Sequence, residues 1–169
     1  MSLFALMLLA ADPLASSPDL GKAEGQCRAA ESGPAIVLVA RGLKDRSGWL
    51  KAEVYPSNDD DFLQDDNILL NAGKVFRRVE GTLAQHGEVT ACIRVPAPGA
   101  YSVILLHDRN TNHRFNWTVD GIGFPGNPAL GWSKPKASAT RLIAGPGITR
   151  VEVVLNYKSG LGVAPLKGR

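Results

Sequence analysis

EVTACIRV (Glu88–Val95) and YSVILL (Tyr101–Leu106), separated by the turn sequence PAPG at residues 96–99, are the segments that decide the fold. Apolar and polar residues alternate in the first segment, which is the period of a β-strand with one buried face. The second is a short, nearly continuous run of apolar, β-branched and aromatic residues, a composition typical of buried strands. Pro and Gly between them mark a turn. The pair predicts two β-strands.

Similar strand-like runs occur along the rest of the chain. They lie at residues 35–43, 49–55, 75–83, 139–143 and 149–157. Trp49–Tyr55 alternates clearly and predicts a half-buried strand, whereas Phe62–Asn71 is ambiguous and includes at most a short helical turn. No segment keeps a helical period, and no strand–helix–strand alternation is visible. We therefore predict an all-β, antiparallel sandwich of about seven strands, immunoglobulin-like or transthyretin-like, with one long ordered loop.

Length and charge limit the domain organisation and the partners. The 169 residues suit one domain, which we place at residues 35–159, after a lead segment at 18–34 and before a flexible tail at 160–169. The net charge is only +3, and Lys and Arg are scattered rather than clustered. Nucleic-acid binders usually carry a basic stripe, so nucleic acid is not an expected partner.

The N-terminus predicts export. Leu3–Ala11, LFALMLLAA, is apolar and is followed by the small residues Ala15, Ser16 and Ser17. This order resembles a secretory signal peptide over residues 1–17, although no Lys or Arg precedes the run. The alternative is a short hydrophobic strand or helix. Because a bilayer span needs about 20 apolar residues, no transmembrane span is expected, and the predicted location is periplasmic or secreted.

Two cysteines, Cys27 and Cys92, each lie close to a strand-like run. Their spacing matches neither a metal site nor a redox motif. In an oxidising compartment they would pair, and we predict a Cys27–Cys92 disulfide. The alternative is two buried thiols.

The most distinctive segment for function is HDRNTNHRFNWTVDGIGFPGNPALGWS at residues 107–133. Loops of this length are usually functional or disordered, and its aromatic residues argue against disorder. We expect an ordered ligand-binding or structural loop with Phe115, Trp117 and Trp132 packed beneath or beside it. The candidate site residues are His107, Asp108, Asn110, Asn112, Asn116, Trp117, Asp120, Trp132 and Ser133.

Asp108, Asn110 and Asn112 are spaced like the opening of a calcium loop. His113 stands where such a loop needs glycine, and Val119 stands where it needs glutamate. Two interpretations stay open. The residues form a weak calcium site, or their side chains make Asx-turns that hold the loop. No other cofactor is expected.

A catalytic site is not predicted. Ser133, His107 and Asp108 are the residue types of a hydrolase triad, but the sequence around Ser133 lacks the G-x-S-x-G elbow. Adjacent His and Asp residues also cannot readily act as base and orienting group for each other. His86, His107 and His113 lack metal-site spacing. We therefore predict no catalytic residues.

The order of these motifs resembles a bacterial family known as domain of unknown function 2141. The resemblance rests on a strand ending in Leu-Leu-His-Asp at 105–108, the following Asn110-x-Asn112, Gly123-x-Pro125 and Gly131-Trp132-Ser133. An opening strand at 36–42 and Gly99-Ala100-Tyr101 before a strand agree with it. The typical family loop continues with Gly and Asp and later carries a Glu, where this chain differs. The family implies an exported β-sandwich without an established activity.

Two classes of function remain. The first is a non-enzymatic envelope module that binds a ligand or protein, or serves as a structural element, through the loop at 107–133. The second is a carbohydrate-active or accessory enzyme domain of the cell envelope. A glycosidase requires two carboxylates facing each other across a cleft, and within the loop the sequence supplies only Asp108 and Asp120.

Overall fold

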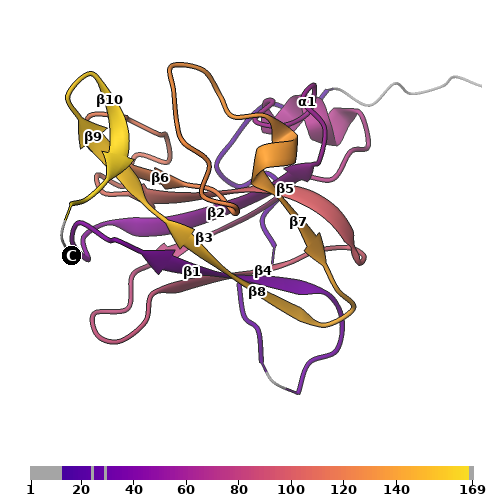
Figure 1. Ribbon diagram of the computed structural model, residues 1–169. Helices are drawn as coiled ribbons and strands as arrows, with labels where there is room; N and C mark the ends of the chain where they lie inside the picture. The colour runs from indigo at the N-terminus through magenta and orange to yellow at the C-terminus, as the bar shows by residue number, and fades with distance from the viewer. Residues whose placement is uncertain (1–12, 24, 29, 168–169) are drawn as a thin grey trace, which may run out of the picture.

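Two β-sheets packed face to face make up the body of the protein, which confirms the predicted β-sandwich (Figure 1). The computed structural model describes residues 13–167 except 24 and 29. The smaller sheet has the order β4-β1-β8, with β4 at Thr90–Arg94, β1 at Ala35–Arg41 and β8 at Ile148–Val154. The larger sheet has the order β10-β9-β6-β5-β2-β3, and β7 also pairs with β5. Its strands are β2 (Trp49–Pro56), β3 (Arg77–Thr82), β5 (Gly99–Asp108), β6 (Gly121–Gly123), β7 (Arg141–Ala144), β9 (Asn156–Ser159) and β10 (Gly162–Pro165).

Strand β5 is the centre of the larger sheet. Along its ten residues it pairs with β2 on one side and with β7 and then β6 on the other. Every residue from Tyr101 to Asp108 is buried. Burial on both faces explains why the segment is continuously apolar, because a strand covered on both sides has no solvent face for polar residues.

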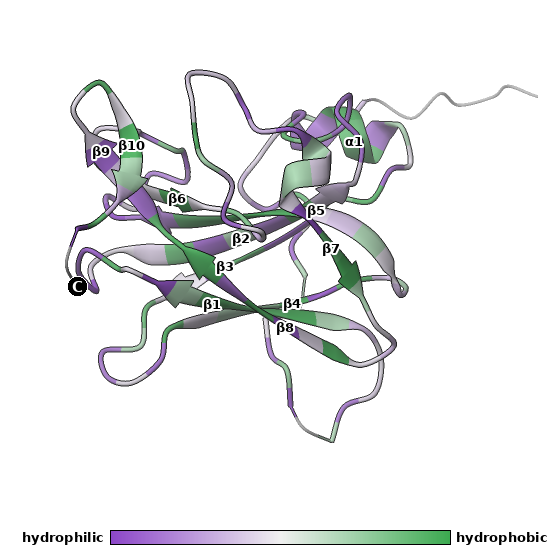
Figure 2. Ribbon diagram, viewed as in Figure 1, coloured by the Kyte–Doolittle hydropathy of each residue, from purple (hydrophilic) through white to green (hydrophobic). Residues whose placement is uncertain are grey.

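The larger sheet is covered on both faces. Leu50, Ala52 and Val54 of β2 point into the main core between the sheets. Tyr55, on the opposite face, belongs to a second apolar cluster with Phe62 and other side chains from outside the sandwich. The short helix α1 (Asp66–Asn71) and its neighbouring loops cover that face, and hydrophobic stretches run along the strands in Figure 2. The prediction that β2 is half-buried is therefore wrong.

A buried ion network explains the polar residues on the outer face of β2. Glu53 Oε1 accepts a hydrogen bond from Arg78 Nε at 2.8 Å, and Tyr55 donates its hydroxyl to Glu53 Oε2 at 2.7 Å. Lys51 Nζ lies 3.4 Å from Glu53, and Arg78 also reaches Asp66 of α1 at 3.2 Å. Burial alone would raise the pKa of Glu53, but the charges of Lys51 and Arg78 hold it below its usual value.

The lead segment before β1 runs across the open side of the sandwich. The Ala23 amide donates to the Arg78 carbonyl at 2.8 Å, and the Arg78 amide donates to the Gly21 carbonyl at 2.7 Å. The segment thereby lines the edge strand β3, and the Cys27–Cys92 disulfide then joins it to β4 of the other sheet. The predicted disulfide is confirmed. Most of the predicted signal segment, residues 1–12, lies outside the described residues.

Four segments differ from the sequence prediction of about seven strands and one long loop. The predicted loop at 107–133 is divided by β6, which pairs with β5 and β9. The run at 149–157 is two strands, β8 and β9, because the chain passes from the smaller to the larger sheet at Leu155. The run at 139–143 is a 3₁₀-helix, Ala137–Thr140, followed by β7. The expected flexible tail contains β10, which pairs antiparallel with β9.

No helix within the described part of the chain is long and apolar enough to cross a membrane. Between residues 13 and 167, apart from 24 and 29, helix occurs as α1, with six residues, and the 3₁₀-helix, with four.

The disulfide should contribute strongly to stability, because it links residues 65 positions apart. On the chain-entropy model, a closed loop of that length lowers the free energy of the native state relative to the unfolded state by about 4 kcal/mol. The Cys27→Ser/Cys92→Ser double variant should therefore unfold at clearly lower urea concentration than the wild type. Adding reductant should shift the wild type toward the variant and leave the variant unchanged. Equal unfolding midpoints would contradict the stabilising role.

Candidate functional site

Two buried carboxylates, Asp108 and Asp120, hold the two ends of the loop that follows β5. Asp108 Oδ2 accepts the His113 amide at 2.8 Å, and its Oδ1 accepts the Asn112 amide at 3.3 Å. Asp120 Oδ1 accepts the Arg109 amide at 2.9 Å, and its Oδ2 accepts the Asn116 amide at 2.8 Å. The loop has no sheet or helix partners of its own, so these carboxylates satisfy backbone groups that secondary structure would otherwise satisfy.

The exposed asparagines continue this pattern. Asn110 Oδ1 accepts the Asn112 amide at 3.3 Å, Asn112 Oδ1 accepts the Arg114 amide at 2.9 Å, and Asn116 Oδ1 accepts the Thr118 amide at 3.0 Å. Each bond spans two residues, which is the Asx-turn geometry. The structure thus shows the hydrogen-bonded loop that the sequence offered as the alternative to a calcium site.

The side-chain oxygens of Asp108, Asn110 and Asn112 accept hydrogen bonds from backbone amides of the loop. The described residues also contain no group of three or more His, Cys, Asp or Glu side chains arranged to hold a metal ion. Calcium binding by these three residues stays a prediction.

His107 is a structural residue at the end of β5. Its Nε2 lies 2.7 Å from the Ser47 carbonyl oxygen, and its Nδ1 lies 2.7 Å from the Tyr157 hydroxyl. A carbonyl oxygen only accepts, so Nε2 carries the proton and Nδ1 accepts from Tyr157. Burial lowers the pKa of His107 and raises that of Tyr157 to about 12. With both ring nitrogens engaged and Ser133 exposed on the surface, His107 is not arranged as a base for Ser133.

Three contacts fix the loop to the sheet beneath it. Lys51 of β2 donates to the His113 carbonyl at 2.8 Å, and His113 Nδ1 lies 2.9 Å from Glu80 of β3. The Trp49 ring packs against the His113 ring, with centroids 4.8 Å apart. His113 has a positive φ of 65°, a conformation that non-glycine residues seldom adopt. These contacts hold it in that conformation.

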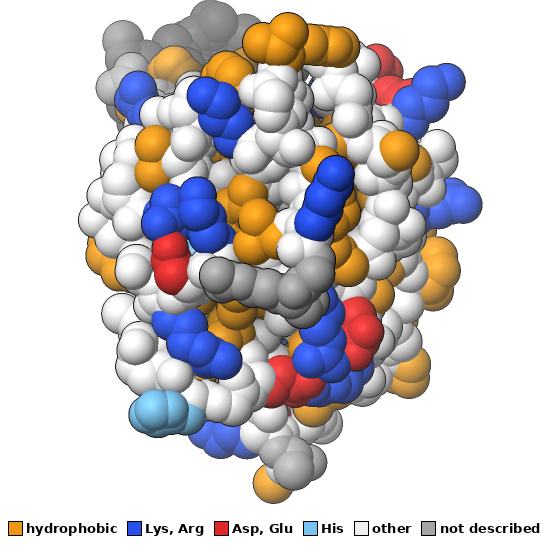
Figure 3. Space-filling view, turned by 60° about the vertical axis from the view of Figure 1, so that its left-hand side comes forward, with side chains coloured by type: hydrophobic (Ala, Val, Ile, Leu, Met, Phe, Trp, Pro, Cys, Tyr) orange, Lys and Arg blue, Asp and Glu red, His pale blue; other side chains and the backbone are white. Residues whose placement is uncertain are grey.

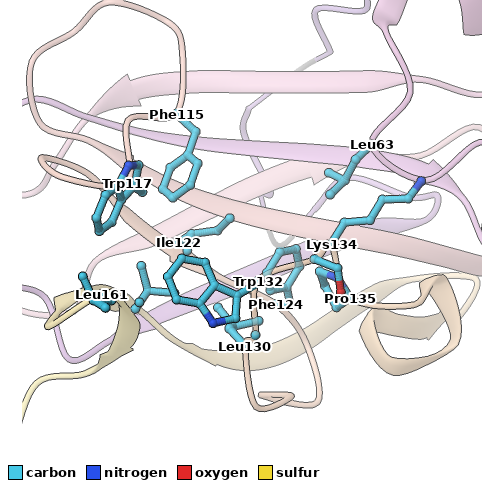
Figure 4. Close-up of a pocket in the computed structure, with 14 residues that line it drawn as sticks. Leu63, Phe115, Trp117, Ile122, Phe124, Leu130, Trp132, Lys134, Pro135 and Leu161 are labelled. Carbon is cyan, nitrogen blue, oxygen red and sulfur yellow. The ribbon is translucent and has the colours of Figure 1, made fainter.

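An apolar groove lies beside the loop, over the outer face of the larger sheet (Figure 4). Its volume is about 380 Å³, within the range of small-molecule sites. In Figure 4, Trp117 and Leu161 lie toward one end, Leu63 and Lys134 toward the other, and Trp132 between them. The lining residues are Leu63, Phe115, Trp117, Ile122, Phe124, Leu130, Gly131, Trp132, Ser133, Lys134, Pro135, Leu161, Gly162 and Val163.

The aromatic residues of the loop are at the groove and largely exposed. Trp132 is 86% exposed, Trp117 43% and Phe115 41%. The sequence led us to expect them packed beneath or beside the loop. They lie beside it without being buried, and among the lining aromatics only Phe124 is fully enclosed.

The groove brings together some of the residues selected from sequence and leaves out others. Trp117, Trp132 and Ser133 line it, whereas the oxygen-bearing residues of the loop serve the backbone instead. Sequence reasoning missed Leu63, Leu161 of the turn between β9 and β10, and Val163 of β10. The apolar residues after the Ser159-Gly160 turn were the available signal for a second strand there.

Positive charge lies at the rim of the groove. Lys134, whose Nζ donates to the carbonyls of Asp59 at 3.0 Å and Phe62 at 2.8 Å, is the one charged residue among those that line it. Lys158 of β9 places its Nζ 5.1 Å from the centroid of the Trp117 ring. Figure 3 shows hydrophobic side chains interspersed with Lys and Arg on the side of the molecule that carries the β9–β10 hairpin.

Removing the Asp108 carboxylate should destabilise the protein. Asp108→Ala leaves the His113 amide without an acceptor and the Asn112 amide with only its long bond to Asn110 Oδ1, which costs about 1–3 kcal/mol. Asn110→Ala removes one long bond at an exposed site and serves as the matched control, with a loss below about 0.5 kcal/mol. Urea unfolding of both variants measures the difference, and equal stability of Asp108→Ala and wild type would show the carboxylate to be dispensable. A calcium titration of the melting temperature on the same proteins tests the metal prediction.

His107 should make stability fall in mildly acidic solution. Its folded-state pKa lies below the ordinary value of 6.5, so the unfolded chain binds the proton first as pH falls. Its contribution is complete above about pH 6.5 and is lost as pH falls toward the folded-state pKa, with a slope of at most about 1.4 kcal/mol per pH unit. Urea unfolding between pH 7.5 and pH 5 should show this slope, reduced in His107→Gln. An unchanged slope in the variant would assign the effect to other groups.

Comparison with known proteins identifies a family and no closer relative. The sequence model of the bacterial family described as "Uncharacterized protein conserved in bacteria (DUF2141)" matches residues 38–152, about two thirds of the chain. No curated protein and no solved structure gives a significant match. The matched region extends from β1 to β8 and includes the whole loop between β5 and β6. The family resemblance drawn from the sequence is therefore confirmed, and the chain belongs to this family of bacterial proteins.

Proposed function

We propose that this protein is a non-enzymatic binding module of the bacterial cell envelope, periplasmic or secreted, that holds an apolar ligand in the groove beside the loop. The observation that carries the proposal is the collection of exposed aromatic and aliphatic side chains around one cavity, with Trp132 86% exposed. The apolar N-terminal run and the Cys27–Cys92 disulfide support the location.

Exposed apolar surface of this kind is costly without a ligand. Contiguous apolar patches on soluble proteins often mark binding sites, and a bound apolar ligand would remove the groove from water. Trp and Tyr residues are also the side chains that most often dominate binding energies. The groove walls are fixed in advance, because the loop is held by Asp108 and Asp120 and the opposite wall by the β9–β10 hairpin. A preformed site loses less entropy on binding.

The non-enzymatic part of the proposal rests on the carboxylates. A glycosidase needs two carboxyl groups facing the sugar across a cleft. Asp108 and Asp120 are buried and accept hydrogen bonds from loop amides, and no Asp or Glu lines the groove. Envelope carbohydrate is also a weaker match as a ligand, because the polar groups in the lining side chains are limited to Ser133, Lys134 and the indole N–H groups of Trp117 and Trp132.

The neutral fluorophore N-phenyl-1-naphthylamine tests the groove directly. It should bind the full chain with enhanced fluorescence, and Trp132→Ala should weaken binding about tenfold, as expected for a central aromatic anchor. Ile143→Ala is the control, because Ile143 is 65% exposed on β7 and does not line the groove. Binding that is absent, or equally weakened by both substitutions, would contradict the proposed function.

A further inference from the structure

The β9–β10 hairpin places one cation on the groove side of the sheet. Lys158 of β9 is the direct cross-strand partner of Val163 of β10. Residues directly opposite each other in an antiparallel pair project to the same face, and Val163 lines the groove. A second observation agrees. Lys158 Nζ lies 5.1 Å from the centroid of the Trp117 ring, which places the ammonium at the Trp117 end of the groove.

Lys158 has no acidic partner among the described residues. Its ammonium makes no hydrogen bond or ion pair within that part of the chain, and its contact with Trp117 is a cation–π interaction. No carboxylate lines the groove either. Asp59, at the Lys134 end of the groove, is engaged otherwise: its carbonyl accepts from Lys134 and its carboxylate accepts the Ala137 amide. Within the described part of the chain, the groove therefore combines an apolar floor with a cation at one end that has no acidic partner.

We infer that the ligand is a single-chain anionic amphiphile, a free long-chain carboxylate, whose hydrocarbon chain occupies the groove and whose carboxylate pairs with Lys158. This inference rests on the proposed function and names the ligand class of the same site. The floor, formed by Ile122, Phe124 and Leu130 with Leu161 and Val163 on the hairpin side, offers no polar group to a chain lying along it. Burying each methylene there is favourable, and the ammonium beside Trp117 attracts the head group at the boundary with water.

The groove favours a free amphiphile over a lipid bilayer. It is a half-open groove of about 380 Å³ between the loop and the hairpin. A concave site takes up one chain, whereas a membrane surface meets side chains that project outward. Binding to a bilayer is accordingly an outcome that would count against the inference.

Charge-matched amphiphiles test the inference. Dodecanoate and dodecyltrimethylammonium carry the same chain length and opposite charges, and each is titrated below its critical micelle concentration against the bound neutral naphthylamine. Dodecanoate should displace the probe with an affinity about tenfold higher than the cation at low salt, because Lys158 attracts one head group and repels the other. The preference should shrink at high salt.

In Lys158→Gln the ratio of the two Kd values should fall to about twofold or less. Lys136→Gln, which changes an exposed lysine outside the lining, should keep the wild-type ratio.

The outcomes separate the inference from the proposed function. If the neutral probe binds through Trp132 but the two amphiphiles compete equally, or Lys158→Gln keeps the full preference, the ligand class is wrong and the binding function stands. Probe binding that does not depend on Trp132 overturns the function itself. Co-sedimentation with phosphatidylglycerol vesicles, without displacement of the probe by dodecanoate, overturns the inference in favour of a membrane surface.

Discussion

The hydrogen bonds of two buried carboxylates are the constraint on which the functional surface depends. Asp108 ends the central strand β5 and Asp120 precedes β6, so the pair stands where an irregular loop leaves and re-enters the sheet. Between them they accept the amides of Arg109, Asn112, His113 and Asn116. A buried amide without an acceptor is costly. By accepting these amides, the two carboxylates fix the path of the loop that carries Phe115 and Trp117.

The groove also depends on an outer layer that a two-sheet sandwich does not require. The outer face of β2 is buried by α1 and its adjoining loops, with Glu53, Arg78 and Asp66 paired inside that layer. Lys51 extends the same network to the His113 carbonyl, so the charges that lie under the layer also hold the loop. The apolar cluster around Phe62 and Phe124 continues into the floor of the groove. The packing of the outer layer therefore also determines the shape of the binding surface.

The sequence predicted the features that depend on residues close together in the chain, namely strands and turns. Alternation in Glu88–Val95 and the apolar run of Tyr101–Leu106 identified two strands, and the Asx spacing identified the turns of the loop. Alternation could not reveal that both faces of β2 are buried, because its second face buries Glu53, which pairs with Arg78 of β3, and Arg78 in turn pairs with Asp66 of α1. The sequence also did not predict that the run at 149–157 divides at Leu155 into strands of two different sheets. Leu155 is apolar, as strand residues commonly are, so it gave no sign of the change of sheet. The groove itself, formed by Leu63, Trp132 and Leu161 from three distant segments, has no signature in a single stretch of sequence.

The lead segment and the C-terminal hairpin both lie outside the part of the chain that the family shares. Residues 38–152 contain neither Cys27 nor Leu161, so a chain trimmed to them would lose one wall of the groove and leave Cys92 with a free thiol. It would also lose the hydrogen bonds that residues 21–23 make to Arg78 on β3. A bare edge strand offers unpaired amides and carbonyls to any other extended chain. In this chain, the extension before β1 therefore occupies the backbone edge of β3 at Arg78, where another extended chain could otherwise pair.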